Sequence, residues 1–279
     1  MSKTALRRKS GKAATSGEYS KEYKGFLKRE RLSKTGVITV QVALFIFIFG
    51  AWELGAQLGF INTFIMSSPS AMWRTLVAHN FLLRDMWASL QAALIGFFVA
   101  TALGTLIAIT LWWSNWLRRV LDPYLTVFNS LPKIALGPII IIWFGIGMQS
   151  IVIMNILIMI VITVLSVLHA LNACDPNKIQ LLKSMNANKF QILWKLVLPN
   201  AVPDFISVLK INVGLTWVGT IMGEYLVSRA GLGHQIVYGG SVFNLNLVMT
   251  AIVVLCALAG TMYLSVAAIE KWVNKSYKR

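Results

Sequence analysis

The sequence predicts an all-α membrane protein with about six transmembrane helices. Of its 279 residues, 57% are hydrophobic and only 13% are charged, whereas a soluble domain has roughly 25% charged residues. The net charge of +16 comes mostly from loops and tails, so topology and lipid head groups explain it more simply than nucleic acid does. The apolar runs lie near residues 37–57, 88–113, 122–146, 149–171, 205–227 and 247–269.

Residues 1–36 predict a basic cytoplasmic tail in front of a membrane domain at 37–270, and a second basic tail follows at 271–279. Through Gly17 the composition is typical of disorder. From Tyr19 onward, apolar residues share one helical face among lysines, which predicts a short helix on the inner membrane surface; a solvated tail is the alternative. The first apolar run starts too late for a signal peptide, so we interpret it as an uncleaved span.

The first outer loop and the second span each carry a packing signal. Ser68 is suited to cap a helix that begins at Pro69. In the second span, small residues recur at every fourth position, which lets another helix approach closely. Packing inside one subunit is the simpler interpretation and a subunit interface the alternative. The small residues are Ala92, Gly96, Ala100, Gly104 and Ala108.

The third span is interrupted within the stretch 131–147 by two prolines and three glycines, a pattern tolerated in membranes where the backbone is buried in protein or lines a cavity. Lys133 lies about ten residues, or about 15 Å, into this span. It therefore either faces the bundle interior or water near mid-bilayer, or snorkels to the cytoplasmic surface from a span that starts later.

The fifth span is the most polar of the six and places Glu224 near its outer end, which makes a direct pair with Lys133 doubtful. A polar turn at 228–233 follows this span on the outer side. The candidate residues of a path through the bundle are Pro132, Lys133, Pro138, Trp217 and Glu224.

Residues 175–203 form a charged segment between two spans. Asp175 followed by Pro176 predicts a helix start. Asn186 interrupts the helix, because Asn readily takes the left-handed conformation that ends one. A second short helix follows, and Leu198-Pro199 is expected to stop it. Its apolar face holds Phe190, Leu193, Trp194 and Val197. Two bent amphipathic helices of this kind predict a docking element for a cytoplasmic partner.

The distribution of basic residues predicts the orientation. The outer side has only Arg74, Arg84 and Arg229, whereas eleven basic residues precede the first span. The segment 175–203 and the C-terminus add four each, and the short link after the second span adds Arg118 and Arg119. The positive-inside rule therefore places both termini and the segment 175–203 in the cytoplasm.

The segment 175–203 is similar to the cytoplasmic signature of permease subunits of binding-protein-dependent ABC importers. That signature reads E-A-A, three residues, Gly, nine residues, Ile, one residue, Leu-Pro, and this sequence keeps its spacing. Gln180 replaces the acid and cannot form its charge pair, whereas Asn186 can do the backbone work of the glycine. The residues that the resemblance assigns to ATPase coupling are Gln180, Leu181, Leu182, Ser184, Asn186, Ala187, Leu196, Leu198 and Pro199.

Two further segments resemble the sulfonate/nitrate/taurine branch of these permeases, and the resemblance covers about residues 52 to 272. They are L-P-K-I-A-L-G-P-I-I-I-I-W-F-G-I-G at 131–147 and G-E-Y-L-V-S-R-A-G-L-G at 223–233. The resemblance implies a type I ABC importer permease fold in the bacterial cytoplasmic membrane. It also implies a second permease copy or paralogue, two ATPase subunits and an extracytoplasmic solute-binding protein as partners.

The resemblance implies a pathway for a small anionic solute such as a sulfonate, taurine or nitrate; a vitamin precursor, thiamine pyrimidine or riboflavin, is the alternative. The sequence has no H-E-x-x-H, G-x-S-x-G or phosphate-binding Gly-Lys-Ser/Thr motif. We therefore expect no catalytic residue, metal or cofactor on this chain, with ATP-Mg²⁺ on the partner ATPases. The cysteines, Cys174 and Cys256, are expected to be free. A membrane scaffold is a weaker alternative, because it leaves the broken third span unexplained.

Overall fold

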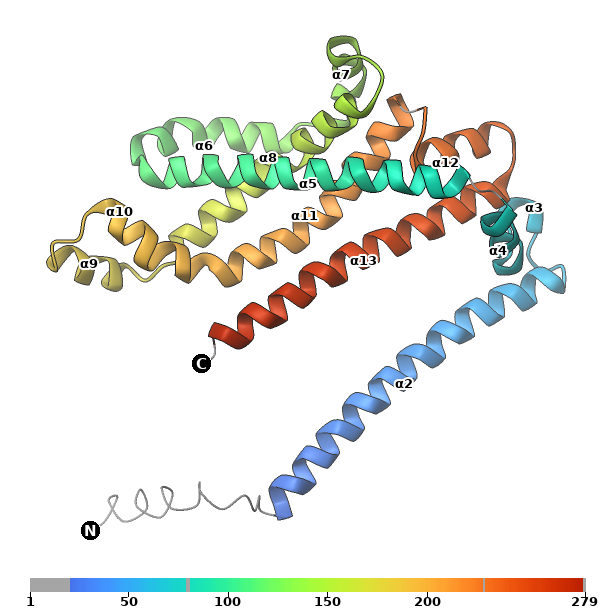
Figure 1. Ribbon diagram of the computed structural model, residues 1–279, viewed down its shortest axis with the longest axis horizontal. Helices are drawn as coiled ribbons and strands as arrows, with labels where there is room; N and C mark the ends of the chain where they lie inside the picture. The colour runs from blue at the N-terminus through green and yellow to red at the C-terminus, as the bar shows by residue number, and fades with distance from the viewer. Residues whose placement is uncertain (1–20, 79–80, 228, 278–279) are drawn as a thin grey trace. The chain divides into compact units, whose positions relative to one another are not determined.

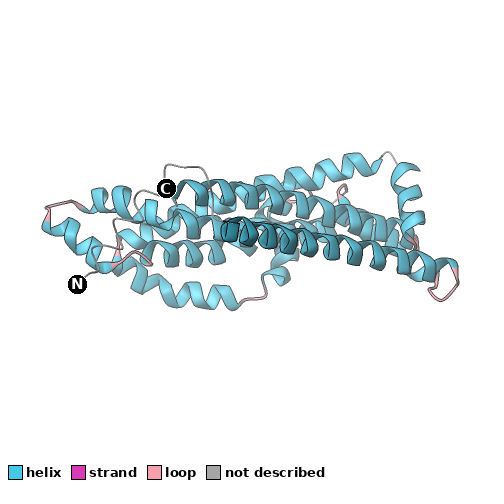
Figure 2. Ribbon diagram, turned by 90° about the horizontal axis from the view of Figure 1, so that it is seen from below, coloured by secondary structure: helices cyan, strands magenta, loops and turns pink. Residues whose placement is uncertain are grey.

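The structure, a computed structural model, describes residues 21–78, 81–227 and 229–277 (Figure 1). Within these ranges the chain consists of helices joined by short loops, without a strand (Figure 2). In chain order the elements are α2 (Lys21–Gln57), α3 (Thr63–Met66), α4 (Pro69–Ala78), α5 (Phe81–Trp113), α6 (Asn115–Ser130), the 3₁₀ turn η1 (Lys133–Leu136), α7 (Gly137–Phe144), α8 (Met148–Asn172), α9 (Pro176–Ser184), α10 (Lys189–Ile192), the π-helix η2 (Leu193–Val197), α11 (Leu198–Val227), α12 (Leu232–Ser241) and α13 (Leu245–Tyr277).

The prediction of an all-α protein with about six spans is confirmed. Segments long and apolar enough to cross a membrane lie at Thr39–Gln57, Leu82–Trp113, Met148–Asn172, Lys189–Leu226 and Leu245–Val273. A sixth crossing is present if the bent pair Asn115–Ser130 and Lys133–Phe144 counts as one span.

The predicted interruption of the third span is present, and the two parts of the span do not follow one line. α6 ends at Ser130, and the segment that contains η1 and α7 is turned by 85° from it, so that α7 leaves the line along which α6 runs beside α5 (Figure 1). Leu131 is extended at φ −67° and ψ 138°, because the proline that follows it disfavours the α conformation. Gly145, with φ 79°, then ends α7.

The described residues 21–61, which contain α2, form a compact unit of their own. α2 runs without a break from Lys21 to Gln57, so no helix end separates the predicted tail 1–36 from the first span. Tyr19, where the surface helix was predicted to begin, lies outside the described residues. The placement of this segment on the inner membrane surface stays a prediction.

The second unit begins at Asn62, and close packing of α5, α8 and α11 forms its centre. The small residues of α5 face this centre, since Ala92, Ala100 and Ala108 are fully buried. A Cβ on Gly96 would lie 2.6 Å from the Asn155 side chain, and one on Gly104 would lie 2.7 Å from the Thr163 side chain. The interpretation of the small residues as a packing face inside one subunit is therefore confirmed.

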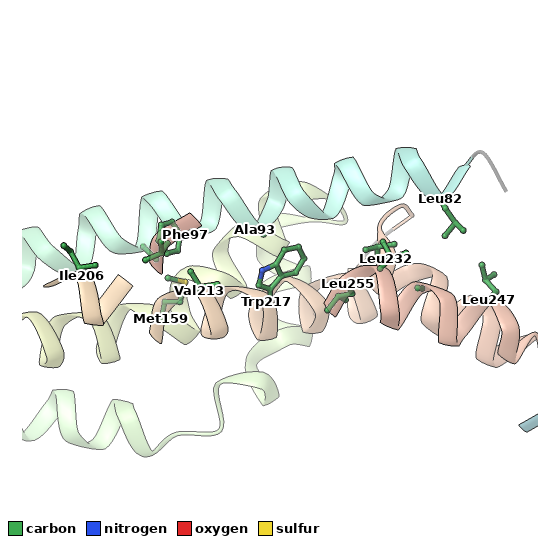
Figure 3. Close-up of a cluster of buried hydrophobic side chains, with 14 residues drawn as sticks. Leu82, Ala93, Phe97, Met159, Ile206, Val213, Trp217, Leu232, Leu247 and Leu255 are labelled. Carbon is green, nitrogen blue, oxygen red and sulfur yellow. The ribbon is translucent and has the colours of Figure 1, made fainter. Parts of the chain in front are cut away.

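A large apolar cluster extends the core towards the end of the unit that holds α12 (Figure 3). Trp217 of α11 lies between Phe97 of α5 and Leu255 of α13 along this cluster (Figure 3). At its end, Leu232 of α12 and Leu247 of α13 join Leu82 of α5. The cluster therefore holds α5, α11, α12 and α13 together without charged groups.

The ends of the second unit agree in part with the sequence analysis. Ser68 Oγ accepts the backbone N–H of Ala71 at 3.2 Å, and α4 begins at Pro69, so the predicted helix start is confirmed. α13 continues to Tyr277, past the predicted boundary at residue 270. The cytoplasmic location of the tail 271–279 stays a prediction.

Gly104→Ala tests the close contact between α5 and α8. Its Cβ would overlap the buried, β-branched Thr163 side chain, so we expect a loss of about 1–3 kcal/mol of stability. Gly214→Ala is the matched control, because it adds a Cβ within helix α11 where no atom lies within 4 Å. Thermal unfolding in detergent should give a lower midpoint for Gly104→Ala alone, and equal midpoints for the two variants would contradict the packing.

Candidate functional site

The first candidate site is the segment 175–203. Asp175 accepts the backbone N–H of Asn177 through Oδ1 at 2.9 Å, and Pro176 is the first residue of α9. This arrangement satisfies one of the free N–H groups at the start of the helix and uses a residue whose fixed φ suits that position. The predicted helix start is therefore confirmed.

The bend after α9 is closed by two backbone hydrogen bonds. Asn186 has φ +60°, and its N–H bonds to the carbonyl of Lys183 at 2.9 Å. The N–H of Ala187 bonds to the carbonyl of Leu182 at 3.0 Å. This pair of bonds is a Schellman motif, which needs a left-handed residue at the position of Asn186. The predicted role of Asn186 in ending the helix is confirmed.

The start of the second helix depends on Asn188, which the sequence analysis missed. Asn188 Oδ1 accepts the N–H of Gln191 at 2.8 Å, and Gln191 Oε1 accepts the N–H of Asn188 at 2.9 Å. These reciprocal bonds form a capping box. The signal was present in the sequence as a capping residue followed three positions later by Gln.

The prediction that Leu198-Pro199 stops the second helix is wrong. α10 passes through the π-helix Leu193–Val197 directly into α11. Pro199 is the second residue of α11, and a proline near the start of a helical segment is tolerated. The wider π turn changes the hydrogen-bond register just before the proline. As a result, the docking segment and the fifth span form one bent but unbroken helix over Lys189–Leu226.

The structure divides the predicted coupling residues between surface and interior. Four of these residues are exposed, namely Gln180, Leu181, Ser184 and Asn186. The other five are partly buried, namely Leu182, Ala187, Leu196, Leu198 and Pro199. Gln180 and Ser184 also line a hollow of about 590 Å³ on the surface of α9.

The prediction that the apolar residues of the second helix share one face is wrong. Leu193 and Val197 are buried, while Phe190 and Trp194 are 60% and 65% exposed, with their rings stacked at 6.4 Å. Leu181 of α9 and Met185, directly after it, add apolar side chains that are 62% and 70% exposed. The segment therefore uses one apolar face to pack on the bundle and presents a second one outward.

Lys189 connects this segment to the end of α5. Its ammonium group donates to the carbonyl of Trp113, the last residue of α5. It also lies 5.7 Å and 5.5 Å from the ring centroids of Trp112 and Trp113. A cation at this position interacts favourably with the carboxyl end of the helix and with both rings.

The polar side chains of the fifth span lie inside the bundle. Asn212 Nδ2 donates to Thr101 Oγ1 and Asn212 Oδ1 accepts from Thr163 Oγ1, each at 3.1 Å. Asn155 Nδ2 donates to Thr220 Oγ1 at 3.0 Å. These bonds connect α5, α8 and α11, so most of the polarity that the sequence shows in this span serves helix contacts.

A cluster of buried polar groups lies where α12 meets α5 and α11. Glu224 Oε1 accepts from Ser89 Oγ at 2.6 Å, and Glu224 Oε2 accepts the backbone N–H of Gly233 at 2.7 Å. Ser89 Oγ in turn accepts the N–H of Leu232 at 2.8 Å. Glu224 is only 2% exposed. The carboxylate therefore holds the first turn of α12 directly and through Ser89.

Asp85 extends this cluster from the first turns of α5. It accepts the backbone N–H of Gly231 at 3.1 Å and a hydrogen bond from the Gln235 side chain. A Cβ on Gly231 would lie 2.4 Å from Glu224 Oε1, and Gly231 has φ +113°. Only glycine fits this conformation and this approach. The sequence analysis missed Asp85 and Ser89, which carry no local motif.

The predicted pathway residues do not come together. Trp217 and Glu224 are enclosed by helices of this chain, whereas Pro132 and Pro138 are exposed. Lys133 is partly exposed, and its Nζ donates to the carbonyl of Asn129 at 3.2 Å. Among the described residues it makes no ion pair with Glu224. In the described ranges, moreover, no group of three or more His, Cys, Asp and Glu side chains is placed to hold a metal ion, and Cys174 and Cys256 are free.

Comparison with known proteins places these features in context. A family model described as binding-protein-dependent transport system inner membrane component matches residues 100–279. A probable ABC transporter permease protein of Haemophilus influenzae is 29% identical over 77% of this chain and 88% of its own length. The taurine transport system permease protein TauC of Escherichia coli is 24% identical over 84% of this chain and 88% of its own length.

Solved structures share the fold at low sequence identity. A chain of the inward-facing MetNI methionine ABC transporter superposes with a TM-score of 0.63 and 22% identity, over 74% of this chain and 99% of that one. A chain of a bacterial ABC transporter involved in the import of alginate gives a TM-score of 0.62 at 14% identity, over 91% of this chain and 99% of that one.

Ser89→Ala tests the cluster around Glu224. The variant leaves a buried carboxylate oxygen and the N–H of Leu232 without a partner, and each costs about 1–3 kcal/mol. We expect faster amide hydrogen exchange over residues 231–236, measured by mass spectrometry. Ser241→Ala, at the exposed end of α12, is the matched control. Unchanged exchange in Ser89→Ala would show that the cluster does not hold this turn.

Proposed function

Because this chain belongs to the family of binding-protein-dependent transport system inner membrane components and has the fold of type I ABC importer permeases, we propose that it forms the translocation pathway of an ATP-driven importer for a small anionic solute. The chain is a multi-pass transport subunit of the bacterial cytoplasmic membrane. ATP hydrolysis belongs to two separate ATPase subunits, which carry ATP and Mg²⁺, and this chain binds no cofactor or metal of its own.

One observation carries the proposed link to the ATPases: the docking segment is continuous with a membrane span. The exposed apolar side chains of α9 and α10 offer a surface to a partner. Leu193 and Val197 fix the same segment to the bundle, and α10 continues into α11 without a break. A movement of an ATPase bound at this surface would therefore reach the fifth span through covalent helix rather than through a flexible loop.

The orientation of the proposed complex follows from the basic residues. The segment 175–203 and both termini lie in the cytoplasm, because these parts carry most of the Lys and Arg and such residues are retained on the inner side. Gln180 lies in the surface hollow on α9 and can offer the ATPase hydrogen bonds but no charge pair. The external solute-binding protein then meets the opposite end of the bundle, where α12 lies.

A second permease, either another copy or a paralogue, completes the pathway. Glu224 and Trp217 are buried in the core of this chain, so the polar centre of the bundle is packed rather than open. Exposed polar residues instead lie on the outside of the bundle along α6, and the partly exposed Lys133 follows in η1. A pathway between two such bundles accounts for this distribution better than a pore through one.

The proposed solute class rests on the relatives and on charge. Permeases named for taurine and aliphatic sulfonates match this chain, and Lys133 lies at the exposed break between α6 and α7. A vitamin precursor is the second candidate, because permeases named for riboflavin and formylaminopyrimidine transport also match. The solute bound by the external binding protein would decide between them.

Asn186→Pro tests the docking segment. Proline cannot adopt the positive φ of Asn186, so the bend should be lost while the spans still insert. We expect binding of the ATPase to weaken by at least about tenfold, or about 1.4 kcal/mol, in a pull-down of the solubilised complex. Asn186→Gly, which allows the same conformation, should bind normally. Full recovery of the ATPase with Asn186→Pro would contradict the proposal.

A further inference from the structure

α6 (Asn115–Ser130) has an exposed polar side to which no side chain of another described helix is hydrogen-bonded. At about 100° per residue, its apolar and polar side chains separate into two arcs. On the apolar arc, Leu117, Leu121 and Leu125 pack against the buried cluster that contains Ala108 of α5 and Val164 of α8. The remainder of the apolar arc is exposed and consists of Trp116, Val120, Tyr124, Val127 and Phe128.

The polar arc is exposed along the full length of the helix. Thr126 Oγ1 and Ser130 Oγ donate to carbonyls of α6 itself, and Lys133, just beyond the helix, donates to the carbonyl of Asn129. Among the described residues, no side chain of another helix bonds to this arc. Its members are Arg118, Arg119, Asp122, Thr126, Asn129 and Ser130.

The position of α6 makes this arc informative. The helix is about 24 Å long and runs beside α5 and α8 (Figure 1), with its leucines packed against residues that lie within their membrane spans. Its later turns therefore extend along the bundle into the depth of the bilayer, whereas Arg118 and Arg119 belong to its beginning, next to the end of α5 at Trp113. Charged and amide side chains at such a depth face protein or water rather than lipid.

Pro123 leaves a backbone carbonyl of α6 that must also face protein or water. This proline lies inside α6 and cannot donate a hydrogen bond to the carbonyl of Arg119. In a membrane, a carbonyl without its helical partner is tolerated where it meets water or protein. Arg119, whose carbonyl loses its partner, belongs to the polar arc, and Pro123 lies at the edge of this arc. Side chains and backbone therefore indicate the same hydrated surface.

We infer that the polar arc of α6, together with Lys133, is the wall of the translocation pathway in this subunit and that it favours anions. The inference rests on the proposed function, which it extends to particular residues. The arc and Lys133 hold three positive groups and a single negative one, Asp122. A surface whose charges are mainly of one sign, bordered by apolar protein, concentrates ions of the opposite charge. The exposed apolar arc of α6 then faces lipid.

Single cysteines on the two arcs test this assignment in the complete permease–ATPase complex, reconstituted in vesicles. The parent variant is Cys256→Ala, which removes the exposed native thiol and leaves the buried Cys174. Thr126→Cys and Asn129→Cys report on the polar arc, and Val120→Cys and Val127→Cys are matched controls on the apolar arc. The probe is the membrane-impermeant anion 2-sulfonatoethyl methanethiosulfonate.

We expect labelling at residues 126 and 129 to be at least about tenfold faster than at 120 and 127, because the reaction needs a hydrated thiolate. Trapping the complex with ATP and vanadate should change the rate at 129 from the cytoplasmic side. Equal rates on both arcs would overturn the inference, because only the polar arc should be hydrated. Four unreactive positions would also overturn it, since the polar arc would then be packed against protein. A rate at 129 that trapping leaves unchanged would indicate a helix on the membrane surface.

A comparison of probe charges tests the preference for anions. At Asn129→Cys, the anionic reagent should react faster than its trimethylammonium counterpart relative to their rates with a free thiol. Lys133→Gln should lower this ratio by about threefold or more at low salt, whereas Lys271→Gln, on the distant end of α13, should not. An unchanged ratio in Lys133→Gln would refute the role of this lysine in anion preference.

The experiment separates this inference from the proposed function. Binding of the ATPase and ATP hydrolysis are measured on every variant. A complex that binds the ATPase and hydrolyses ATP but labels evenly on both arcs overturns the assignment of α6 alone. A parent protein that fails to bind any ATPase overturns the proposed function.

Discussion

The requirement that polar groups find partners inside the bilayer determines most of this structure. No water is available in the hydrocarbon core to satisfy a backbone or side-chain group. The fifth span nevertheless contains Asn212 and Thr220, and both bond to side chains of neighbouring helices. These bonds require the helices to approach closely, which the glycines of α5 permit. The small residues therefore allow the close helix contacts through which the buried amides are hydrogen-bonded.

Helix ends meet the same requirement in different ways on the two sides of the bundle. At α12, three successive backbone N–H groups bond to Asp85, Ser89 and Glu224, all of them buried. At α9 and α10, caps come from neighbouring residues in the same segment, such as Asn188. The first arrangement joins three helices, whereas the second shapes one segment and leaves its surface open for a partner. Each arrangement suits the side of the bundle on which it occurs.

The features that were predictable from sequence are those fixed by a few adjacent residues. The start of α9 at Asp175-Pro176 and the left-handed Asn186 follow from backbone preferences, and both are present. The break at Leu131 was predicted from the prolines and glycines of the span. The 85° turn at this break and the continuous helix through Pro199 were not predicted, because each depends on neighbouring geometry as much as on the proline. The cluster around Glu224 joins residues more than 130 positions apart in the sequence, so no local sequence pattern predicts it.

The contacts of α5 with the long helix Lys189–Leu226 have a mechanical consequence. Lys189 bonds to the last residue of α5 at one end, and Glu224 bonds to Ser89 near the other. The first contact is exposed and electrostatic, so it is weak and easily replaced by a partner. The second is buried, and its disruption would leave unsatisfied polar groups in the core. A force applied to α10 should therefore break the Lys189 contact first, whereas the buried packing of Leu193 and Val197 and the bonds of Glu224 keep the two helices together.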